Sequence, residues 1–355
     1  MKVRILILST ILVTFLAGFV CFKPSGFFSA QSRMKWFLLT EAEPVFTHAG
    51  PFLSVIFFDK DNGIAVSPIT IDKTDDGGTN WTAVKNWDEN NRGFSSIISA
   101  NGLLWIVGSE KNKPLILTTK THGYKWEDWQ KINLSGKSTT ELQSKFSVFY
   151  DMCFDPSGNA WAVGDGGVAQ LIRGDREWQV SNIADSKDTL YSVSCNSAGQ
   201  VWAVGENGAV FHFQDSWAKR KIDENSVFTR VVSFGKEIWI LGGKSSSADQ
   251  DKRKGVLLRS KDGGQTWENK TPESASVLND IYINGVNGWL VGNDGSLYST
   301  RNGGNSWSKE NSPTKNNLTK LFPLDSQNIW AVGERVSVLK YQDSSLPLPE
   351  RKKNW

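Results

Sequence analysis

Cysteine and histidine, the residues that most often bind metals or carry redox chemistry, are scarce in this sequence. Its 355 residues include three of each. His48, His122 and His212 are far apart and lack the spacing of metal ligands. No Cys-x-x-Cys pair, phosphate-binding loop or Gly-x-Ser-x-Gly nucleophile motif occurs. These absences argue against the common metal, redox and nucleophilic sites, so we expect no cofactor, no bound metal and no catalytic residue.

The cysteines can form at most one disulfide bond. Cys21 lies in an apolar N-terminal segment, which leaves Cys153 and Cys195 as the possible pair. When the repeats described below are aligned, these two residues fall one step out of register. They should then face opposite sides of their strands. We therefore expect both to be buried free thiols.

Charge of one sign is not in excess either. The chain has 40 Lys and Arg against 37 Asp and Glu, a net charge of +3. A nucleic-acid-binding protein of this size typically has a stronger basic excess, clustered on one face. We expect no nucleic-acid partner.

One long apolar run is present, at the N-terminus. Lys2 and Arg4 precede 18 uncharged, largely apolar residues, 5–22, and this pattern indicates export. The run is long for the core of a signal peptide and just short of the ~20 residues that span a bilayer. An uncleaved membrane anchor, a cleaved signal peptide and a lipid on Cys21 remain open. Each places the following domain outside the cytoplasm, in a periplasm or lumen, and an anchor or a lipid tethers it to the membrane.

Internal repetition dominates the rest of the chain. A Trp-x-Val-Gly signature, with substitutions in some copies, recurs about every 40–50 residues, the length of a four-stranded propeller blade. Its first residues are Ile64, Trp105, Trp161, Trp202, Trp239, Trp289 and Trp330. Seven copies predict an all-β, seven-bladed β-propeller of four-stranded antiparallel blades. We divide the chain into a signal peptide or anchor (1–22), a linker (23–34), the propeller (35–346) and a C-terminal tail (347–355).

A second motif lies between the third and fourth strands expected in each blade. Its best copy is Ser260-x-Asp262-x-Gly264-x-Thr266-Trp267. Asp and Ser or Thr side chains bond to nearby backbone groups, glycine supplies the turn, and the tryptophan packs between sheets, so we assign a structural role. Two further copies are centred on Asp76, Gly78 and Trp81 and on Asn302, Gly304 and Trp307. In the second, third and fourth blades the motif is incomplete, and the outer strands are expected to begin at Trp126, Trp178 and Trp217.

The seventh blade lacks this motif and its tryptophan. Residues 336–341 form its expected third strand, and no tryptophan follows before the tail. A ring of sheets must close or leave a sheet edge exposed. Residues 35–40, which include Trp36, resemble the start of an outer strand. We predict that they complete the last blade.

The turns after the signature are the candidate binding face. In a propeller they lie on the same face as the connections between blades, next to the central channel. An acidic ring here could hold a cation or a basic partner segment, although Gly-acid-x-Gly is also an ordinary tight turn. The acids are Glu110, Asp165, Glu206, Asp294 and Glu334. Three arginines flank them and could pair with the acids or with an acidic partner: Arg92, Arg230 and Arg335.

The Ser-x-Asp-x-Gly-x-Thr-Trp motif resembles the Asp-box of sialidase-type (BNR) repeats. A sialidase would also need a Phe/Tyr-Arg-Ile-Pro motif, which this chain lacks. The seven signature repeats, the Asp-box turns and the leading Trp36 segment together resemble the photosystem II assembly/stability factor (Ycf48-like) family and its relatives in non-photosynthetic bacteria, over residues 35–343. The resemblance implies an exported propeller that binds protein partners through a basic patch, which cannot be matched residue by residue here.

We therefore expect an exported or membrane-tethered, non-catalytic propeller that acts as a protein-interaction or assembly scaffold, with membrane-associated protein partners. Two rivals remain open. One is a glycan hydrolase or lyase that uses the acids of the channel face. The other is a carbohydrate-binding module that uses exposed aromatic side chains such as Trp87 or Trp129.

Overall fold

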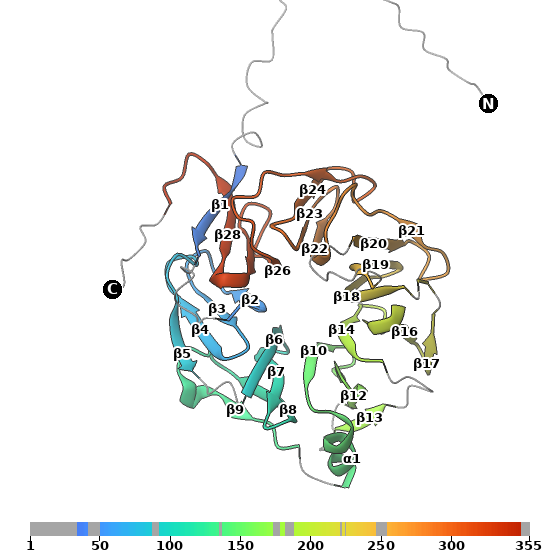
Figure 1. Cartoon of the computed structure of the whole chain (residues 1–355). Helices are drawn as coiled ribbons and strands as arrows, with labels where there is room; N and C mark the ends of the chain where they lie inside the picture. Colours follow the sequence, from blue (N-terminus) through green and yellow to red (C-terminus); the bar gives the residue numbers. More distant parts are fainter. Residues whose placement is uncertain are drawn as a thin grey trace, which may run out of the picture.

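Seven four-stranded antiparallel sheets surround a central channel (Figure 1). The computed structural model of the chain describes residues 34–41, 50–86, 92–134, 137–172, 178–181, 188–220, 222–223, 225–245 and 254–348. Within each of the first six blades, successive strands are neighbours, from an inner strand at the channel to an outer strand at the rim. The predicted seven-bladed β-propeller is confirmed.

The strands follow one another blade by blade. The first blade contains β2 (Ser54–Phe57), β3 (Gly63–Val66), β4 (Thr70–Thr74) and β5 (Thr82–Asn86), and the second contains β6 (Arg92–Ala100), β7 (Leu103–Glu110), β8 (Lys113–Thr119) and β9 (Gln130–Lys131). The third contains β10 (Phe149–Phe154), β11 (Ala160–Gly164), β12 (Gly167–Leu171) and β13 (Gln179–Ser181), and the fourth β14 (Leu190–Cys195), β15 (Val201–Gly205), β16 (Val210–Phe213) and β17 (Trp217–Lys219). The fifth contains β18 (Ser226–Phe234), β19 (Glu237–Lys244), β20 (Gly255–Ser260) and β21 (Glu268–Asn269), and the sixth β22 (Leu278–Asn284), β23 (Asn287–Gly292), β24 (Leu297–Thr300) and β25 (Ser308–Lys309). The seventh contains β26 (Leu318–Pro323), β27 (Ile329–Gly333), β28 (Val338–Asp343) and β1 (Met34–Thr40).

Short helices occur only in connections within the described part of the chain. The α-helix α1 (Lys137–Lys145) lies between the second and third blades. The 3-10 helix η1 (Trp126–Asp128) precedes β9, and η2 (Glu206–Gly208) and η4 (Glu334–Val336) follow the second strands of the fourth and seventh blades.

The second strand of each blade carries the Trp-x-Val-Gly signature and is largely buried. All five residues of β15 and of β27 are buried. Such a strand lies inside its sheet and between two neighbouring blades, so both faces need apolar side chains. The closing glycine has a separate cause: a Cβ on Gly205 would lie 1.9 Å from the Thr189 carbonyl oxygen, and one on Gly333 would lie 2.0 Å from that of Asn317. The signature therefore specifies burial together with a close approach of the chain that enters the blade.

The three intact Asp-boxes have the same hydrogen-bonded geometry. In the fifth blade, the Ser260 hydroxyl donates to Asp262 (2.8 Å) and accepts the Gly264 N–H (2.8 Å). Asp262 also accepts the Thr266 N–H (2.9 Å). The corresponding bonds join Thr74, Asp76, Gly78 and Asn80 in the first blade and Thr300, Asn302, Gly304 and Ser306 in the sixth. The motif is thus a self-contained turn.

The Asp-boxes of the fifth and sixth blades also pack on the preceding blade. Trp267 stands edge-on to Trp202, with 6.1 Å between ring centroids, and Trp307 stands edge-on to Trp239 at 6.3 Å. Gly264 has a φ of 81°, and a Cβ there would lie 2.3 Å from the Trp202 ring. Glycine alone satisfies both constraints. The turn therefore joins two blades as well as two strands.

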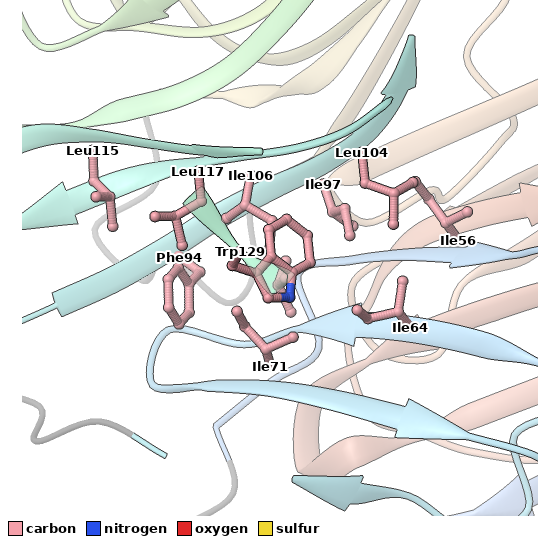
Figure 2. Close-up of a cluster of buried hydrophobic side chains, with 11 residues drawn as sticks. Ile56, Ile64, Ile71, Phe94, Ile97, Leu104, Ile106, Leu115, Leu117 and Trp129 are labelled. Carbon is pink, nitrogen blue, oxygen red and sulfur yellow. The ribbon is translucent and has the colours of Figure 1, made fainter. Parts of the chain in front are cut away.

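In the second blade, a different tryptophan from the predicted one precedes the outer strand. Trp126 begins η1, whereas Trp129 immediately precedes β9 and donates its indole N–H to the Gly123 carbonyl (3.0 Å). Trp129 is 7% exposed and packs among apolar residues of the first two blades, including Ile71 and Phe94 (Figure 2). The expectation for Trp126 was wrong because three additional residues form a helical turn before the strand. Burial also removes Trp129 as an exposed sugar-binding ring, and Trp87 lies outside the described residues.

The ring closes where the two ends of the described chain meet. Strand β1 lies beside β28 (Figure 1). The two strands pair antiparallel, with Trp36 opposite Tyr341. Their rings are 5.4 Å apart, and Trp36 is 9% exposed. The predicted closure by an N-terminal strand is confirmed, and it covers the edge that β28 would otherwise expose.

Cys153 and Cys195 form a disulfide bond with Cα atoms 5.7 Å apart, so the expectation of two free thiols was wrong. They belong to β10 and β14, the inner strands of neighbouring blades. The two residues are one step out of register, as the repeat alignment indicates: Cys153 lies opposite Trp161, whereas Cys195 lies opposite Val201. In a propeller, however, sheets face one another. Opposite faces of equivalent strands therefore meet between adjacent blades, and the offset brings the two sulfur atoms together.

No helix among the described residues is long and apolar enough to cross a membrane. The predicted anchor or signal segment, residues 5–22, lies outside those residues, as do Cys21 and the linker up to residue 33.

Candidate functional site

Seven equivalent positions form one layer around the channel. Each blade contributes the inner-strand residue that pairs with the third residue of its signature, and we call these residues the channel layer. They are Ser54, Ser96, Asp151, Ser192, Arg230, Asp280 and Lys320. The layer thus combines serine hydroxyls from the first, second and fourth blades with acids from the third and sixth and bases from the fifth and seventh.

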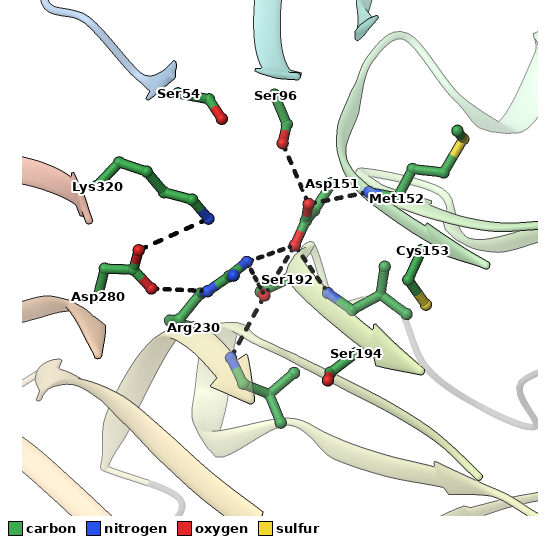
Figure 3. A network of polar contacts seen from close by, with 12 residues as sticks. Ser54, Ser96, Asp151, Met152, Cys153, Ser192, Ser194, Arg230, Asp280 and Lys320 are labelled. Atoms are coloured by element: carbon green, nitrogen blue, oxygen red, sulfur yellow. Dashed lines mark hydrogen bonds and ion pairs between the residues drawn. The ribbon is translucent and has the colours of Figure 1, made fainter. Parts of the chain in front are cut away.

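Arg230 is the centre of this layer (Figure 3). Its Nη1 lies 3.1 Å from Asp151 Oδ2, and its Nε lies 3.0 Å from Asp280 Oδ1. The Ser192 hydroxyl donates to Asp151 (2.9 Å), and the Ser96 hydroxyl donates to the other oxygen of the same carboxylate (3.3 Å). These contacts link inner strands from the second to the sixth blade.

Lys320 completes the network on the far side of Asp280. Its Nζ lies 3.7 Å from Asp280 Oδ2, which also accepts the Leu321 N–H at 3.0 Å. Burial and then the neighbouring Arg230 lower the pKa of Lys320, although Asp280 and Asp151 act in the opposite direction. For Arg230, burial acts to lower the pKa, but Asp280 and Asp151 outweigh it and raise the pKa. Two carboxylates therefore balance two cations.

The layer is better suited to holding the ring together than to proton transfer. It borders a cleft of about 370 Å³ in the channel, which the disulfide and apolar side chains such as Phe322 also line. A pair of carboxyl groups that cleaves a glycosidic bond needs one member that gives up and takes back a proton. Here, Asp151 and Asp280 are both bound to the same guanidinium group and to backbone N–H groups.

The acids predicted on the channel face bind groups of their own blades. Four accept hydrogen bonds from residues that enter the inner strand: Asp165 from the Ser147 N–H (2.9 Å), Glu206 from the Tyr191 hydroxyl (2.6 Å), Asp294 from the Ser276 hydroxyl (2.6 Å) and Glu334 from the Asn317 amide (2.8 Å). The fifth, Glu110, pairs with Lys131. Three of these contacts join the turn after the signature to the segment that enters the inner strand, whereas Glu206 is bound by Tyr191 within β14 and Glu110 by Lys131 in β9. A ligand-binding role for these acids stays a prediction.

The three predicted arginines lie in different surroundings. Arg230 belongs to the channel layer. Arg335 is exposed in η4, beside Glu334. Arg92 begins β6, where its backbone pairs with Glu110, and its side chain lies outside the described structure. Among the described residues, no group of three or more His, Cys, Asp and Glu side chains is arranged to hold a metal ion.

Sequence reasoning identified Arg230 but missed the rest of the channel layer. The distance from the layer to the first residue of the signature varies, from nine residues in the second blade (96 to 105) to ten in the third (151 to 161). The turn between the first two strands has different lengths, and a β-bulge interrupts the inner strands. Counting back from the signature tryptophan with the turn length allowed to vary would have aligned the seven polar residues.

The sequence of this chain is similar to those of known proteins. A family model described as "Photosynthesis system II assembly factor YCF48" matches residues 251–339. The photosystem II assembly lipoprotein Ycf48 of Synechococcus sp. (strain CC9902) is 25% identical over 314 residues, which cover 83% of this chain and 86% of that protein. This chain is a BNR-type propeller that resembles the Ycf48 assembly factors.

Solved structures show the same fold. YCF48 bound to a D1 peptide has a TM-score of 0.64 at 17% identity and covers 87% of this chain and 97% of its own. YCF48 from Cyanidioschyzon merolae has a TM-score of 0.61 at 18% identity, with 88% and 99% covered. A catalytically inactive virginiamycin B lyase from Staphylococcus aureus is as similar in shape, with a TM-score of 0.64 at 14% identity and 87% and 99% covered. At these identities, the shared feature is the propeller, which also supports catalysis in other proteins.

Proposed function

We propose that the chain is an exported, non-catalytic β-propeller that binds other proteins and serves as a scaffold in the assembly of a membrane protein complex. The observation that carries this proposal is the similarity to a photosystem II assembly factor across 83% of the chain. A solved YCF48 holds a D1 peptide, which supports a protein as the partner. The channel layer supports a non-catalytic role, because Arg230 binds both of its carboxylates.

The proposal includes a tether at the membrane. The Ycf48 relative is named a lipoprotein, which supports attachment through the N-terminal segment. Cys21 is the residue in that segment that could carry a lipid. Membrane fractionation of the full chain and of Cys21→Ser tests this point. A lipid tether predicts that labelling with a radioactive fatty acid marks the wild-type chain but not Cys21→Ser, whereas an apolar anchor predicts that neither is labelled and both stay with the membrane.

A crosslinking pull-down tests the scaffold function. The full chain, tagged at its C-terminus and expressed in its own host, is crosslinked in isolated membranes, and co-purifying proteins are identified by mass spectrometry. We expect subunits or precursors of one membrane complex, enriched over a tagged, unrelated exported propeller. If no membrane protein is enriched over that control, the proposal is wrong.

The predicted binding face can be tested in the same assay. Arg335 is exposed on that face, and Lys261 is an exposed lysine in the Asp-box of the fifth blade, at the opposite side of the sheets. If the channel face binds the partner, Arg335→Glu lowers partner recovery, and the charge-matched Lys261→Glu does not. The enzyme rival instead predicts that Asp165→Ala combined with Glu206→Ala abolishes a turnover and leaves partner recovery unaffected.

A further inference from the structure

The seventh blade lacks an element that covers the preceding blade elsewhere in the ring. In the first, fifth and sixth blades, the Asp-box turn lies on the turn between the first two strands of its own blade. The N–H groups of Gly77, Gly263 and Gly303 bond to the carbonyls of Asp61, Lys236 and Val286 at 2.7–2.9 Å. In the fifth and sixth blades, the next glycine packs on the signature tryptophan of the preceding blade. A Cβ on Gly264 would lie 2.3 Å from Trp202, and one on Gly304 would lie 2.4 Å from Trp239.

Register identifies the corresponding segment of the seventh blade. Tyr341 pairs with Ile329 as Thr300 pairs with Gly288 and Ser260 pairs with Ile238. Tyr341 therefore takes the place of the first Asp-box residue.

The residues after Tyr341 keep only part of the motif. Asp343 takes the aspartate position and accepts the Ser345 N–H at 2.8 Å. Ser345 itself stands where the second glycine should be. The chain continues to Leu346, which is 57% exposed, instead of folding back across Trp289. Trp36 still pairs with Tyr341 as the outer-strand tryptophan, so the missing parts are the Ser or Thr of the first position and the glycine turn.

A cleft of about 380 Å³ occupies this position between the sixth and seventh blades. Its apolar wall is formed by Trp289, with Tyr282 stacked 6.1 Å from it and Tyr341 edge-on at 5.1 Å. Its rim is the turn of residues 326–328 in the seventh blade and the turn ends Asn284 and Asn287 in the sixth. The turn of residues 326–328 and Trp289 correspond to the two elements on which the Asp-box turns of the fifth and sixth blades lie, the turn between the first two strands of their own blade and the signature tryptophan of the preceding blade.

The polar lining of the cleft favours a peptide. It is rich in amide side chains, which can both donate to and accept from a peptide backbone. Gln342 is 5% exposed and lines the cleft, and its Nε2 has no hydrogen-bond partner among the described residues. Leaving a buried donor unpaired is unfavourable, so a ligand carbonyl here would be stabilising. The described residues that line the cleft include no cation, which argues against an acidic ligand.

We propose that this cleft binds a polar, glycine-containing turn of a partner protein, in the position that an Asp-box turn fills at other blades. The proposal rests on the scaffold function, because it names the kind of partner segment. The glycine lies against the Trp289 ring, the backbone of the turn bonds to the turn of residues 326–328, and Gln342 donates to a carbonyl.

The experiment uses this chain's own Asp-box as the probe. A fluorescently labelled peptide of residues 260–267 is titrated with the full chain, and binding is followed by fluorescence anisotropy. We expect saturable binding, and a peptide with Gly264→Ala should bind about ten-fold more weakly or worse, because its Cβ meets an indole ring. Gln342→Ala in the protein should weaken binding without abolishing it.

Two matched variants separate the cleft from the rest of the surface. Ser326 is exposed at the rim, so Ser326→Trp fills the cleft and should abolish peptide binding. Ser157 is exposed in the equivalent turn of the third blade, and Ser157→Trp should leave binding unchanged. Thermal unfolding of both variants checks that the fold is retained.

Four results would overturn the proposal: no saturable binding, binding unaffected by Ser326→Trp, binding of oligosaccharides but not of the peptide, or peptide binding only after residues 349–355 are removed. The last result would make the chain's own tail the occupant. The crosslinking pull-down repeated with Ser326→Trp distinguishes this failure from failure of the scaffold function. If the variant still recovers the partners of the wild-type chain, the scaffold function holds and the cleft is not its site.

Discussion

Neighbouring blades are joined in different ways at successive points of the ring. The Asp-box turns of the fifth and sixth blades each place a glycine and a tryptophan against the signature tryptophan of the preceding blade. Between the third and fourth blades, Trp217 still packs edge-on against Trp161, with 5.7 Å between ring centroids, but the other Asp-box residues are not retained. There, the Cys153–Cys195 disulfide joins the inner strands at the channel. A covalent bond near the axis thus accompanies the loss of a hydrogen-bonded turn at the rim.

Removal of the disulfide should have the largest effect, because it is the covalent link between the third and fourth blades. The bond closes a sequence separation of 42 residues, and a loop of this length corresponds to about 4 kcal/mol of unfolded-state entropy. We expect Cys153→Ser combined with Cys195→Ser to lower the free energy of unfolding by about that amount, measured by urea denaturation. Cys21→Ser serves as the control. An unchanged midpoint in the double variant would mean that the third and fourth blades do not depend on the covalent bond.

A substitution at one Asp-box glycine tests the joint between the fourth and fifth blades. Gly264 and Gly263 both have a positive φ, but a Cβ on Gly263 meets nothing within 4 Å. We expect Gly263→Ala to cost about 1 kcal/mol, the cost of a left-handed alanine. Gly264→Ala adds overpacking against Trp202 and should cost about 3 kcal/mol. Equal losses of stability in the two variants would show that the contact between blades contributes nothing.

The same contrast explains what could be predicted from the sequence. Asp-boxes, signature strands and closure by Trp36 depend on residues that are close in sequence or repeated at similar intervals, so their patterns were visible. The disulfide and the channel layer depend on which residues of different blades meet. A bulge near the start of an inner strand or a change in turn length shifts that register by one residue and turns side chains to the other face. Trp129 was missed for a similar reason, since η1 moves the outer strand by three residues.

The side chains above the signature tryptophans also differ from blade to blade. Arg259 lies over Trp239 and Lys340 over Trp330, each 4.7 Å from the ring centroid, whereas His212 stacks on Trp202 at 4.2 Å. Burial, and then the nearby Arg220, lower the pKa of His212 to about 4. The fourth blade therefore has a neutral ring where the fifth and seventh blades have cations.

This difference predicts a loss of stability in acid. The unfolded chain binds a proton at His212 near pH 6.5, and the folded chain binds it near pH 4, so the contribution of the neutral ring is fully present above pH 6.5 and is lost as the pH falls to about 4. We expect His212→Phe to reduce the acid-induced loss of stability by about 2 kcal/mol. The measurement is urea denaturation at pH 7 and at pH 4. His122→Phe, which removes an exposed histidine, is the control, and an equal effect of the two substitutions would contradict the assignment.

The smallest effect is expected at the Asp-box position where one blade has aspartate and another has asparagine. Asp262 and Asn302 hold the same position in the fifth and sixth blades, and both accept the bond from the preceding hydroxyl and from the backbone N–H four residues on. Hydrogen bonds, first from the Thr266 hydroxyl and N–H, lower the pKa of Asp262 to about 2.

Asp262→Asn should therefore leave the melting temperature at pH 7 nearly unchanged. Because the pKa is depressed in the folded chain, the contribution of the carboxylate is present above about pH 4 and is lost as the pH falls toward 2. The variant should then retain more of its neutral-pH stability than the wild-type chain in this acid range, as measured by thermal unfolding at pH 7 and pH 3. A loss at pH 7 as large as that of Gly264→Ala would mean that the carboxylate contributes as much to the joint between the blades as the glycine against Trp202. The Asp-boxes of the fifth and sixth blades would then no longer be equivalent, and the turn proposed for the cleft beside Trp289 would need an acidic residue as well as a glycine.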